Sequence, residues 1–261
     1  MSRKRKEKGV VLSQKMIAPD IYDMWISTSL AKEVLPGQFV GVYTNNASKL
    51  LPRPISICEV DDRKTAFRLV YRIAGEGTKE FAAWQKGQEV FLLGALGNGF
   101  PIKEAEGKKV VLMGGGIGIP PMLQLAKVLS ETGVNVTIVS GYRDAKIFLK
   151  EDMEKYGTLY IATEDGSVGV KGNVLTVMEK EQIETDVIMA CGPMPMLRGI
   201  KNYAQAHQIS AYISLEERMA CGVGACLGCV CKTTHKDAHS HVNNARICTD
   251  GPVFDAREVE I

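Results

Sequence analysis

The sequence predicts three structural units: an antiparallel β-barrel, an α/β domain with a parallel sheet, and a small C-terminal module held together by metal. Short apolar runs separated by turn residues fill the first hundred positions, and strands alternate with helical segments after Lys108. Four of the seven cysteines lie between Cys221 and Cys231. A chain of 261 residues is longer than one core usually supports, which also favours several units. We place them at 1–100, 101–213 and 214–261.

The first unit is predicted to be a small antiparallel barrel or sandwich, because its apolar runs are short and end at turn residues. The basic run from Arg3 to Lys8 lies at the terminus and is expected to be a solvated tail. The expected strands are residues 22–26, 38–43, 55–60, 66–73 and 89–93, and one helix is expected at 78–85.

The second unit alternates buried strands with helices, which is typical of a parallel sheet covered on both faces. A linker near 97–107, rich in glycine and containing Pro101, separates it from the first unit. The expected strands are residues 110–113, 134–139, 159–163 and 187–190, and helices are expected at 121–131 and from about Met196.

Composition and charge exclude several classes of protein. The chain is 45% hydrophobic and 24% charged, as in ordinary globular proteins, and its net charge of +2 is too small to indicate nucleic acid or an anionic membrane as a partner. The least charged stretch, 110–126, contains three consecutive glycines and two prolines, so we expect no membrane-spanning helix there. No apolar signal region is visible near the N-terminus. We therefore expect a cytoplasmic protein.

The C-terminal cysteines have the spacing of a plant-type 2Fe-2S site. Cys221, Cys226 and Cys229 are separated by four and then two residues, and Cys248 follows at a distance. The glycines among them permit the tight turns that wrap thiolates around one edge of a cluster. We therefore predict that these four cysteines hold the iron, in a reducing compartment.

The other cysteines and the nearby histidines have simpler interpretations. Cys231 alternates with Cys229 in an extended stretch and should point the opposite way, as a buried small apolar side chain. Cys58 is interpreted in the same way. A solvated loop is expected to carry His235, His239 and His241, although a mixed zinc site of cysteine and histidine stays open.

Two glycine turns in the second unit follow predicted strands. The first contains Gly114, Gly115, Gly116, Ile117 and Gly118 and leads into a helix that begins with proline. Backbone N–H groups at such a turn can bind a pyrophosphate. The strict dinucleotide fingerprint fails, because residue 119 is isoleucine where that pattern has glycine.

The second turn is Cys191-Gly192-Pro193, at the carboxyl end of another strand. Ligands of open α/β sheets bind at such ends, so the two turns are expected to form one crevice. Cys191 is either a buried thiol or a contact for a nicotinamide ring. Near the end of the second strand, Asp144 beside the single cation Arg143 disfavours a 2′-phosphate, which favours NAD over NADP.

Two turns in the first unit are suited to bind an anion. Arg53-Pro54-Ile55-Ser56 combines a cation, a rigid turn and a hydroxyl at the start of a strand. Gly75 to Gly77 then lead into the single helix, where Thr78 is expected as the cap.

With these motifs in place, the chain resembles the ferredoxin-reductase superfamily over almost its whole length. Arg53 to Ser56 are similar to that family's flavin motif, with Ile55 where an aromatic residue is usual. Gly77-Thr78 are similar to its flavin pyrophosphate turn, and the glycine run with Cys191-Gly192-Pro193 to its nicotinamide half. The order of the units and the ending Cys248-Thr-Asp-Gly-Pro-Val-Phe254 resemble the electron-transfer subunits of dihydroorotate dehydrogenase B.

The resemblance implies the cofactors and the partner. It implies a heterotetramer, two copies of each subunit, with an FMN-containing catalytic subunit that oxidises dihydroorotate to orotate in pyrimidine biosynthesis, while this chain delivers the electrons to NAD, an exchanging substrate. It also implies that the four cysteines hold the cluster. By motif match the contacts to FAD are Arg53, Pro54, Ile55, Ser56, Val70, Tyr71, Arg72, Gly77 and Thr78.

FAD is expected between the other two redox groups, because a nicotinamide moves two electrons together and a 2Fe-2S cluster accepts one. No protein residue is expected to act as a catalytic acid or base. Two alternatives stay open: a subunit of another reductase complex, such as an NADH-dependent ferredoxin:NADP reductase or a hydrogenase, and a redox-sensing or zinc-binding protein without turnover.

Overall fold

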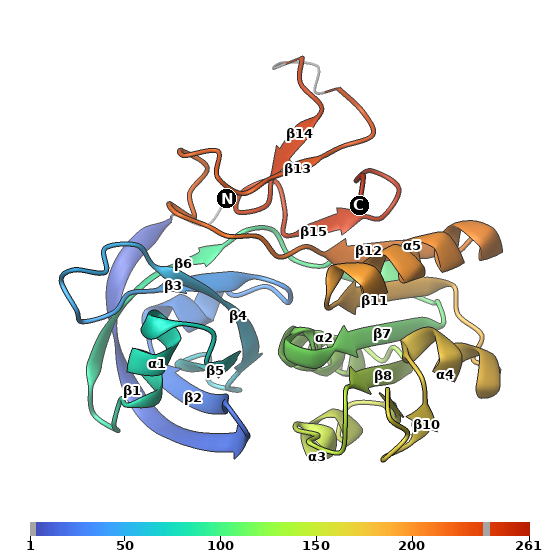
Figure 1. The fold of residues 1–261 in the computed structure, drawn as a ribbon, viewed down its shortest axis with the longest axis horizontal. Coiled ribbons are helices and arrows are strands. Elements are labelled where there is room, and N and C mark those ends of the chain that lie inside the picture. The colour runs from blue at the N-terminus through green and yellow to red at the C-terminus, as the bar shows by residue number, and fades with distance from the viewer. Residues whose placement is uncertain (1–3, 237–240) are drawn as a thin grey trace.

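The computed structural model describes residues 4–236 and 241–261. A barrel and a sheet lie side by side, and the C-terminal part of the chain extends above both (Figure 1). The barrel and the parallel sheet that the sequence predicts are therefore confirmed. The described ranges contain no helix with the length and apolar character needed to cross a bilayer.

The first unit is a closed barrel with strand order β1-β2-β5-β4-β3-β6. All its pairs are antiparallel, and apolar side chains such as Phe67, Leu69 and Leu92 fill its interior. The strands are β1 (Arg5–Ala18), β2 (Ile21–Ser27), β3 (Phe39–Val42), β4 (Arg53–Val60), β5 (Ala66–Arg72) and β6 (Glu89–Leu96), with a 3-10 turn η1 (Ser29–Glu33) and the helix α1 (Glu76–Ala82). Helix α1 begins two residues before Thr78, so Thr78 lies in its first turn and is not its cap.

The prediction that the basic N-terminal run is a solvated tail is wrong for its described strand residues. Arg5 to Lys8 begin β1 and pair with β6, where Arg5 lies opposite Gly94. Arg5 forms ion pairs with Glu7 and Glu33, and Lys8 Nζ lies 2.7 Å from a carboxylate oxygen of Glu89. The side chains of residues 5–8 that face away from the barrel interior are charged, so this segment has no apolar run that could identify it as a strand.

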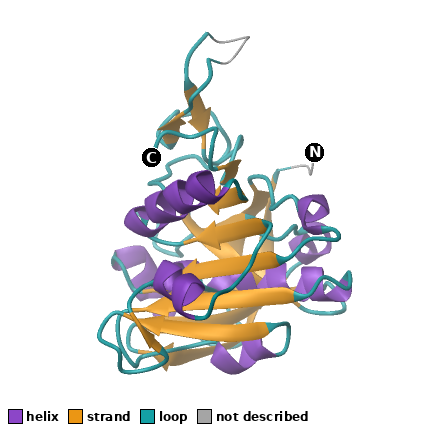
Figure 2. Ribbon diagram, turned by 90° about the vertical axis from the view of Figure 1, so that its right-hand side faces the viewer, coloured by secondary structure: helices purple, strands orange, loops and turns teal. Residues whose placement is uncertain are grey.

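The second unit is a seven-stranded sheet of order β10-β9-β8-β7-β11-β12-β15, parallel except at its β15 edge. Figure 2 shows these strands one above another, with helices packed against them. The strands are β7 (Val110–Gly115), β8 (Val136–Tyr142), β9 (Thr158–Thr163), β10 (Val170–Lys171), β11 (Val187–Cys191), β12 (Ser210–Ser214) and β15 (Val253–Asp255). The helices are α2 (Pro120–Glu131), α3 (Lys150–Glu154), α4 (Val174–Lys180) and α5 (Met194–His207), with short 3-10 turns η2 (Ile102–Ala105) and η3 (Gly116–Gly118).

Each face of the sheet has its own apolar core. Side chains of α2 and α3, including Leu123 and Met153, pack on the face toward the barrel. Side chains of α4 and α5, including Val177 and Leu197, pack on the other face. Helix α2 therefore lies between the sheet and the barrel (Figure 1).

The C-terminal segment leaves the sheet after β12 and returns to it at β15. Ile213 of β12 lies opposite Phe254 of β15 in an antiparallel pair. Between these strands the chain forms the cysteine loop and a small two-stranded sheet, β13 (Val230–Lys232) with β14 (Asn244–Arg246). Asn98, at the end of the barrel, donates hydrogen bonds to the carbonyls of Asp250 and Val253. The base of this segment is thus held by the other two units.

Candidate cofactor sites

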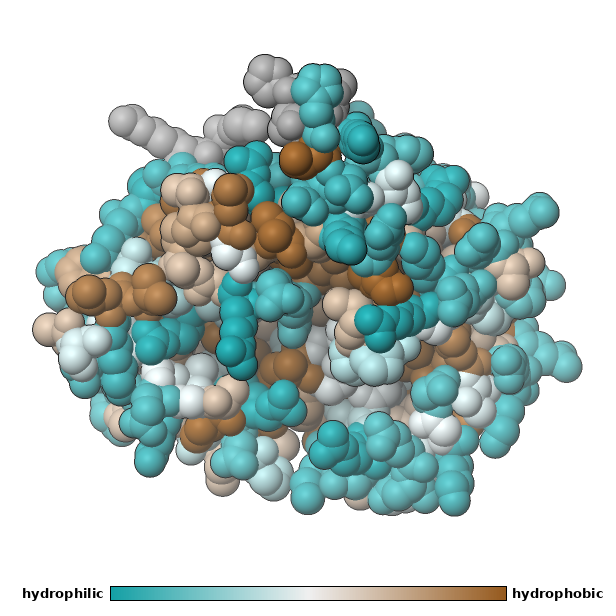
Figure 3. All heavy atoms as spheres, turned by 45° about the horizontal axis from the view of Figure 1, so that its top comes forward, coloured by the Kyte–Doolittle hydropathy of each residue, from teal (hydrophilic) through white to brown (hydrophobic). Residues whose placement is uncertain are grey.

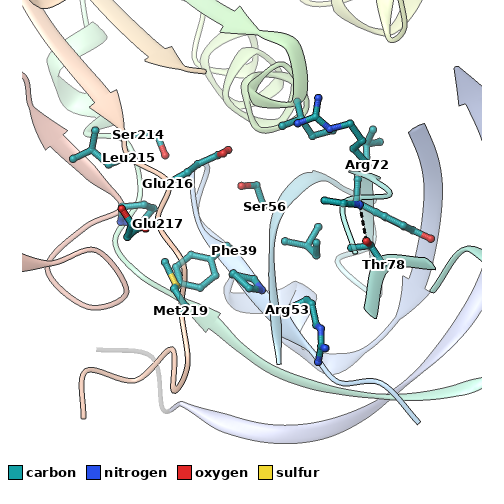
Figure 4. Close-up of a pocket in the computed structure, with 17 residues that line it drawn as sticks. Phe39, Arg53, Ser56, Arg72, Thr78, Ser214, Leu215, Glu216, Glu217 and Met219 are labelled. Carbon is teal, nitrogen blue, oxygen red and sulfur yellow. Dashed lines mark hydrogen bonds between the residues drawn. The ribbon is translucent and has the colours of Figure 1, made fainter. Parts of the chain in front are cut away.

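A cavity of about 320 Å³ opens between the mouth of the barrel and the loop that follows β12 (Figure 4). Strands β4 and β5 are antiparallel neighbours, so the start of β4 and the end of β5 meet at this mouth. Glu216 and Met219 line the opposite side. Eight of the nine predicted FAD contacts line the cavity: Arg53, Pro54, Ile55, Ser56, Val70, Tyr71, Arg72 and Thr78.

The ninth predicted contact, Gly77, lies directly against Arg53. A Cβ atom at Gly77 would be 2.1 Å from Arg53 Nε, so only glycine leaves room for the guanidinium. The Thr78 hydroxyl accepts a hydrogen bond from the amide of Ala74 at 2.9 Å and donates one to the carbonyl of Gly75 at 3.0 Å. The Arg53 guanidinium and the hydrogen-bonded turn at Gly77-Thr78 thus meet at one end of the cavity. Together they can supply the positive charge and the N–H donors that a pyrophosphate requires.

A second cavity of about 590 Å³ lies at the carboxyl ends of β7, β8 and β11. The residues of the two predicted glycine turns that line it are Gly115, Gly116, Ile117, Gly118, Gly192 and Pro193. Gly114 and Cys191 stand opposite each other in the parallel strands just before these turns. A Cβ atom at Gly118 would be 2.4 Å from the Cys191 carbonyl oxygen, so the two turns touch backbone to backbone. The structure thus brings the two turns into one crevice.

The Cys191 thiol is buried in the structure, and its contact with a nicotinamide ring stays a prediction. The side chain is completely buried, and burial raises the pKa of the thiol far above its usual value. Its Sγ lies 4.0 Å from Oε1 of Glu216.

Glu216 is a residue that the sequence analysis missed. With Arg72 and Ile117 it lines both cavities, so these residues form the boundary at which the two cavities meet. Loss of hydration beside the surrounding protein raises the pKa of the Glu216 carboxyl, and the nearby positive charge of Arg72 opposes that increase. Glu216 lies two residues after the buried end of β12, and a charged residue at the carboxyl end of a parallel strand is a signal that could have identified it.

The end of the second cavity away from Glu216 contains four charged side chains. Arg143, Asp144, Lys146 and Glu164 line it, after β8 and β9. The prediction that Arg143 is the single cation here is wrong, because the chain folds Lys146 back into the cavity wall. Asp144 neutralises Lys146, with Oδ2 3.3 Å from Nζ. Positive and negative charges are therefore equal in number at this end.

The four predicted iron ligands form two neighbouring pairs. The thiol of Cys221 lies close to that of Cys226, and the thiol of Cys248 lies close to that of Cys229. Among the residues that the structure describes, no three or more His, Cys, Asp or Glu side chains gather as closely as a single metal ion requires. A two-iron cluster divides four thiolates between two irons, so paired cysteines fit it better than a mononuclear zinc site.

Backbone amides of the same loop point at the cysteine sulfurs. The Sγ atom of Cys221 accepts hydrogen bonds from the amides of Val223 and Cys226, each at 3.4 Å, and that of Cys226 accepts one from Gly228 at 3.4 Å. Partial burial raises the pKa of the Cys221 thiol, but these amides outweigh it and lower the pKa to about 6. Gly222 has a φ of 68°, a conformation that glycine adopts without strain. The loop is therefore built to hold thiolates.

The remaining cysteine and histidine predictions have mixed outcomes. Cys58 is completely buried, as predicted. Cys231 is half-buried, lies opposite Ala245 and packs against the apolar cluster that also contains Cys229 and Cys248. His235 and His241 are exposed, in agreement with a solvated loop, and His239 lies outside the described residues.

A closed barrel with an anion-binding mouth, a parallel sheet with a dinucleotide crevice, and a cysteine loop define a reductase of the ferredoxin-reductase class with an iron–sulfur segment attached. Residues 216–260 match the family described as the iron-sulfur cluster binding domain of dihydroorotate dehydrogenase B. Residues 112–202 match the oxidoreductase NAD-binding domain.

Curated relatives are similar over nearly the full length. The electron transfer subunit of dihydroorotate dehydrogenase B (NAD(+)) from Bacillus velezensis is 42% identical over 98% of this chain and 100% of its own. The subunit of the same description from Bacillus caldolyticus is 43% identical over 97% of this chain and 98% of its own. The chain belongs to the family of dihydroorotate dehydrogenase B electron-transfer subunits.

Solved structures show the same fold. The NADH-dependent reduced ferredoxin-NADP oxidoreductase matches with a TM-score of 0.86 and 29% identity, over 97% of this chain and 89% of the other. The ferredoxin reductase of carbazole 1,9a-dioxygenase matches with a TM-score of 0.67 and 18% identity, over 79% and 67% of the two chains. The second match therefore does not extend over the whole of this chain.

Proposed function

We propose that this chain passes electrons between NAD and an FMN-containing dihydroorotate dehydrogenase catalytic subunit in pyrimidine biosynthesis. The arrangement of the three candidate sites carries this proposal. The barrel cavity shares Glu216 with the dinucleotide crevice, and its lining reaches Met219, two residues before Cys221. The barrel cavity thus stands between the other two sites, in the order that a two-electron donor, a flavin and a one-electron cluster require.

The barrel cavity is the proposed site of FAD. Arg53 and the turn at Gly77-Thr78 supply the cation and the donors for its pyrophosphate, and residues 70–72 with Ser56 form the wall beside its ring system. FAD accepts two electrons together and releases them one at a time, which neither NAD nor the cluster does.

The crevice at the sheet is the proposed site of NAD. The glycine turn before α2 presents backbone N–H groups and the positive end of a twelve-residue helix to a pyrophosphate. Since Arg72 and Glu216 mark the end next to the barrel, the nicotinamide belongs there and the adenosine belongs beside Asp144. The balanced charges at the adenosine end leave no surplus cation for a 2′-phosphate, which supports NAD rather than NADP.

The cysteine loop is the proposed site of the 2Fe-2S cluster, held by Cys221, Cys226, Cys229 and Cys248. The Cys226 side chain is exposed, so one edge of the loop is accessible to a partner. We propose two copies of this chain with two catalytic subunits, in the cytoplasm, where a reducing environment keeps these thiols free for iron.

Co-expression with the catalytic subunit, followed by anaerobic purification, tests the proposal. We expect flavin and iron–sulfur absorption bands, two irons and two acid-labile sulfides per chain, and reduction of NAD by dihydroorotate only when both subunits are present. A colourless protein, or one zinc per chain, would refute it. A chain that carries both cofactors but joins a different oxidoreductase would instead support the alternative suggested by the ferredoxin-NADP oxidoreductase match.

A further inference from the structure

Two side chains of α2 clamp the backbone of Val60, the last residue of β4. Gln124 Oε1 accepts a hydrogen bond from the Val60 amide at 2.7 Å, and Lys127 Nζ donates one to the Val60 carbonyl at 3.1 Å. Gln124 and Lys127 are only 7% and 8% exposed, although they are polar. Lys127 also forms an ion pair with Asp62, just beyond the strand. Two side chains of the sheet unit thus converge on the backbone of one barrel residue.

The two clamped elements carry the two dinucleotide cavities at their other ends. Strand β4 begins with the Arg53 to Ser56 motif, which lines the barrel cavity. Helix α2 begins at Pro120, directly after the glycine turn that lines the crevice. A strand and a helix are stiff, so a contact that sets their relative position also sets the relative position of the two cavities.

A second contact between the two units has the same character. The guanidinium of Arg68 donates two hydrogen bonds of 2.9 Å to Asp23 within the barrel. It also contacts Asp152 of α3 at 3.0 Å across the interface. Arg68 lies in β5, the strand whose residues 70–72 line the barrel cavity. Strands β4 and β5, which both line the cavity, are therefore each tied to the sheet unit.

Polar groups are suited to fix the relative position of two units because hydrogen bonds depend on the angle as well as on the distance between donor and acceptor. Apolar side chains can slide past each other at little cost, whereas an acceptor and a donor aimed at the N–H and C=O of one residue are satisfied in a single register. A buried ammonium is costly unless its hydrogen bonds are made, so a shift of α2 along β4 would leave Lys127 and the two backbone groups of Val60 unpaired.

We propose that Gln124 and Lys127 are positioning residues, which hold the nicotinamide crevice and the flavin cavity at the separation that hydride transfer requires. This inference rests on the proposed function. In that transfer NADH becomes NAD⁺, and FAD takes up the hydride with its two electrons. A misplacement of about 1 Å between reacting groups can slow a reaction by about a hundredfold.

The test uses the complete FAD- and cluster-containing complex with Gln124→Leu and Lys127→Met. We expect reduction of the flavin by NADH in a single turnover to slow by about tenfold or more, while the Kd for NADH changes by less than about twofold. The long-wavelength absorption of the NADH–flavin pair should weaken, and amide hydrogen exchange at residues 58–62 should become faster.

Two further variants serve as controls. Lys150→Met removes a lysine whose ion pair with Glu154 lies within α3, so it should leave the rate and the absorption unchanged. Gln124→Glu keeps an acceptor for the Val60 amide and should behave like the unsubstituted protein. If Gln124→Leu does not fold, Lys127→Met carries the test alone.

The outcomes separate this inference from the proposed function. If Gln124→Leu and Lys127→Met retain FAD and slow flavin reduction no more than Lys150→Met, the positioning role is refuted, even when their melting temperatures fall. If the unsubstituted complex does not reduce its flavin with NADH, the proposed function fails instead. In that case unchanged hydrogen exchange at residues 58–62 in the variants would refute the clamp, and faster exchange would support it.

Discussion

The carboxyl group of Glu216 lies beside the buried thiol of Cys191, with Oε1 4.0 Å from Sγ. Cys191 ends β11 and Glu216 follows β12, the neighbouring parallel strand. Glu216 points into the barrel cavity, whereas Cys191 belongs to the apolar core (Figure 4). The pair therefore forms part of the wall between the proposed flavin site and the interior of the sheet.

Replacing Glu216 by glutamine should stabilise the protein at neutral pH and have no effect in acid. The surrounding protein raises the pKa of the carboxyl, so folding favours its protonated form. The stability of the unsubstituted protein is complete below the usual pKa of glutamate and falls as the pH rises through the raised pKa. Thermal unfolding of both proteins should show that Glu216→Gln has the higher melting temperature, and that the difference in melting temperature increases from about pH 5 to about pH 8.

The difference in melting temperature should be small, because the Glu216 side chain is exposed to solvent in the cleft. A difference that decreases as the pH rises would contradict the prediction.

Alanine at Gly77 should weaken FAD binding by about tenfold or more, which corresponds to about 1.4 kcal/mol. The new methyl group would lie 2.1 Å from Arg53 Nε and would displace the guanidinium from the barrel cavity. Fluorescence titration of the flavin-free protein with FAD measures the effect. Gly75→Ala is the matched control, because a Cβ atom there meets nothing within 4 Å and its φ of 178° suits any residue. Equal affinities of the two variants would show that Arg53 does not contribute to the site.

Alanine at Gly118 should destabilise the sheet unit by about 2 kcal/mol and raise the KM for NADH. Its Cβ atom would lie 2.4 Å from the Cys191 carbonyl oxygen and 2.6 Å from the Gly192 amide nitrogen, so the two glycine turns would have to separate. Gly199→Ala in α5 provides the comparison, since its Cβ atom meets only the flexible end of Leu175 at 3.3 Å. That variant should be neutral or slightly stabilising. An unchanged KM in Gly118→Ala would argue against NAD binding between the turns.

Cys229→Ala and Cys231→Ala should have opposite consequences, although the two residues are neighbours in one short stretch. Cys229 is a predicted ligand that lies beside Cys248, whereas Cys231 is a small apolar side chain packed against the apolar cluster that contains both and is not a predicted ligand. We expect Cys229→Ala to lose iron and electron transfer to the partner but to keep NADH-to-dye activity. Cys231→Ala should keep two irons per chain, measured by iron and sulfide analysis.

The dye assay also tests the order of the redox groups. If reduction of the dye and of the partner fell together in Cys229→Ala while FAD stayed bound, the cluster could not be the last group in the chain.

Local patterns identified the three units and most of the candidate site residues. The cysteine spacing, the glycine turns and the Arg53 to Ser56 motif are short segments whose chemistry depends on adjacent residues, so the printed sequence is sufficient to find them. The positive φ of Gly222 agrees with the reason for expecting glycine there, whereas the need for glycine at position 77, beside Arg53, is visible only in the structure.

Contacts between distant segments could not be found in this way. Residues 5–8 are a strand because β6 lies beside them, and Lys146 enters the crevice because the chain turns back after β8. Glu216 is a candidate site residue because the barrel cavity and the crevice meet at it, and only the folded chain brings these two cavities together.

The amino-acid order alone was enough for the fold class, for the family and for the four proposed iron ligands, because each depends on spacing along the chain. The relative position of the barrel and the sheet depended on folding, since Val60 and Gln124 are 64 positions apart in the sequence and meet only when the chain between them has packed. A hydrogen bond between groups so far apart leaves no periodic pattern in either segment, and its partners are known only when both surfaces exist.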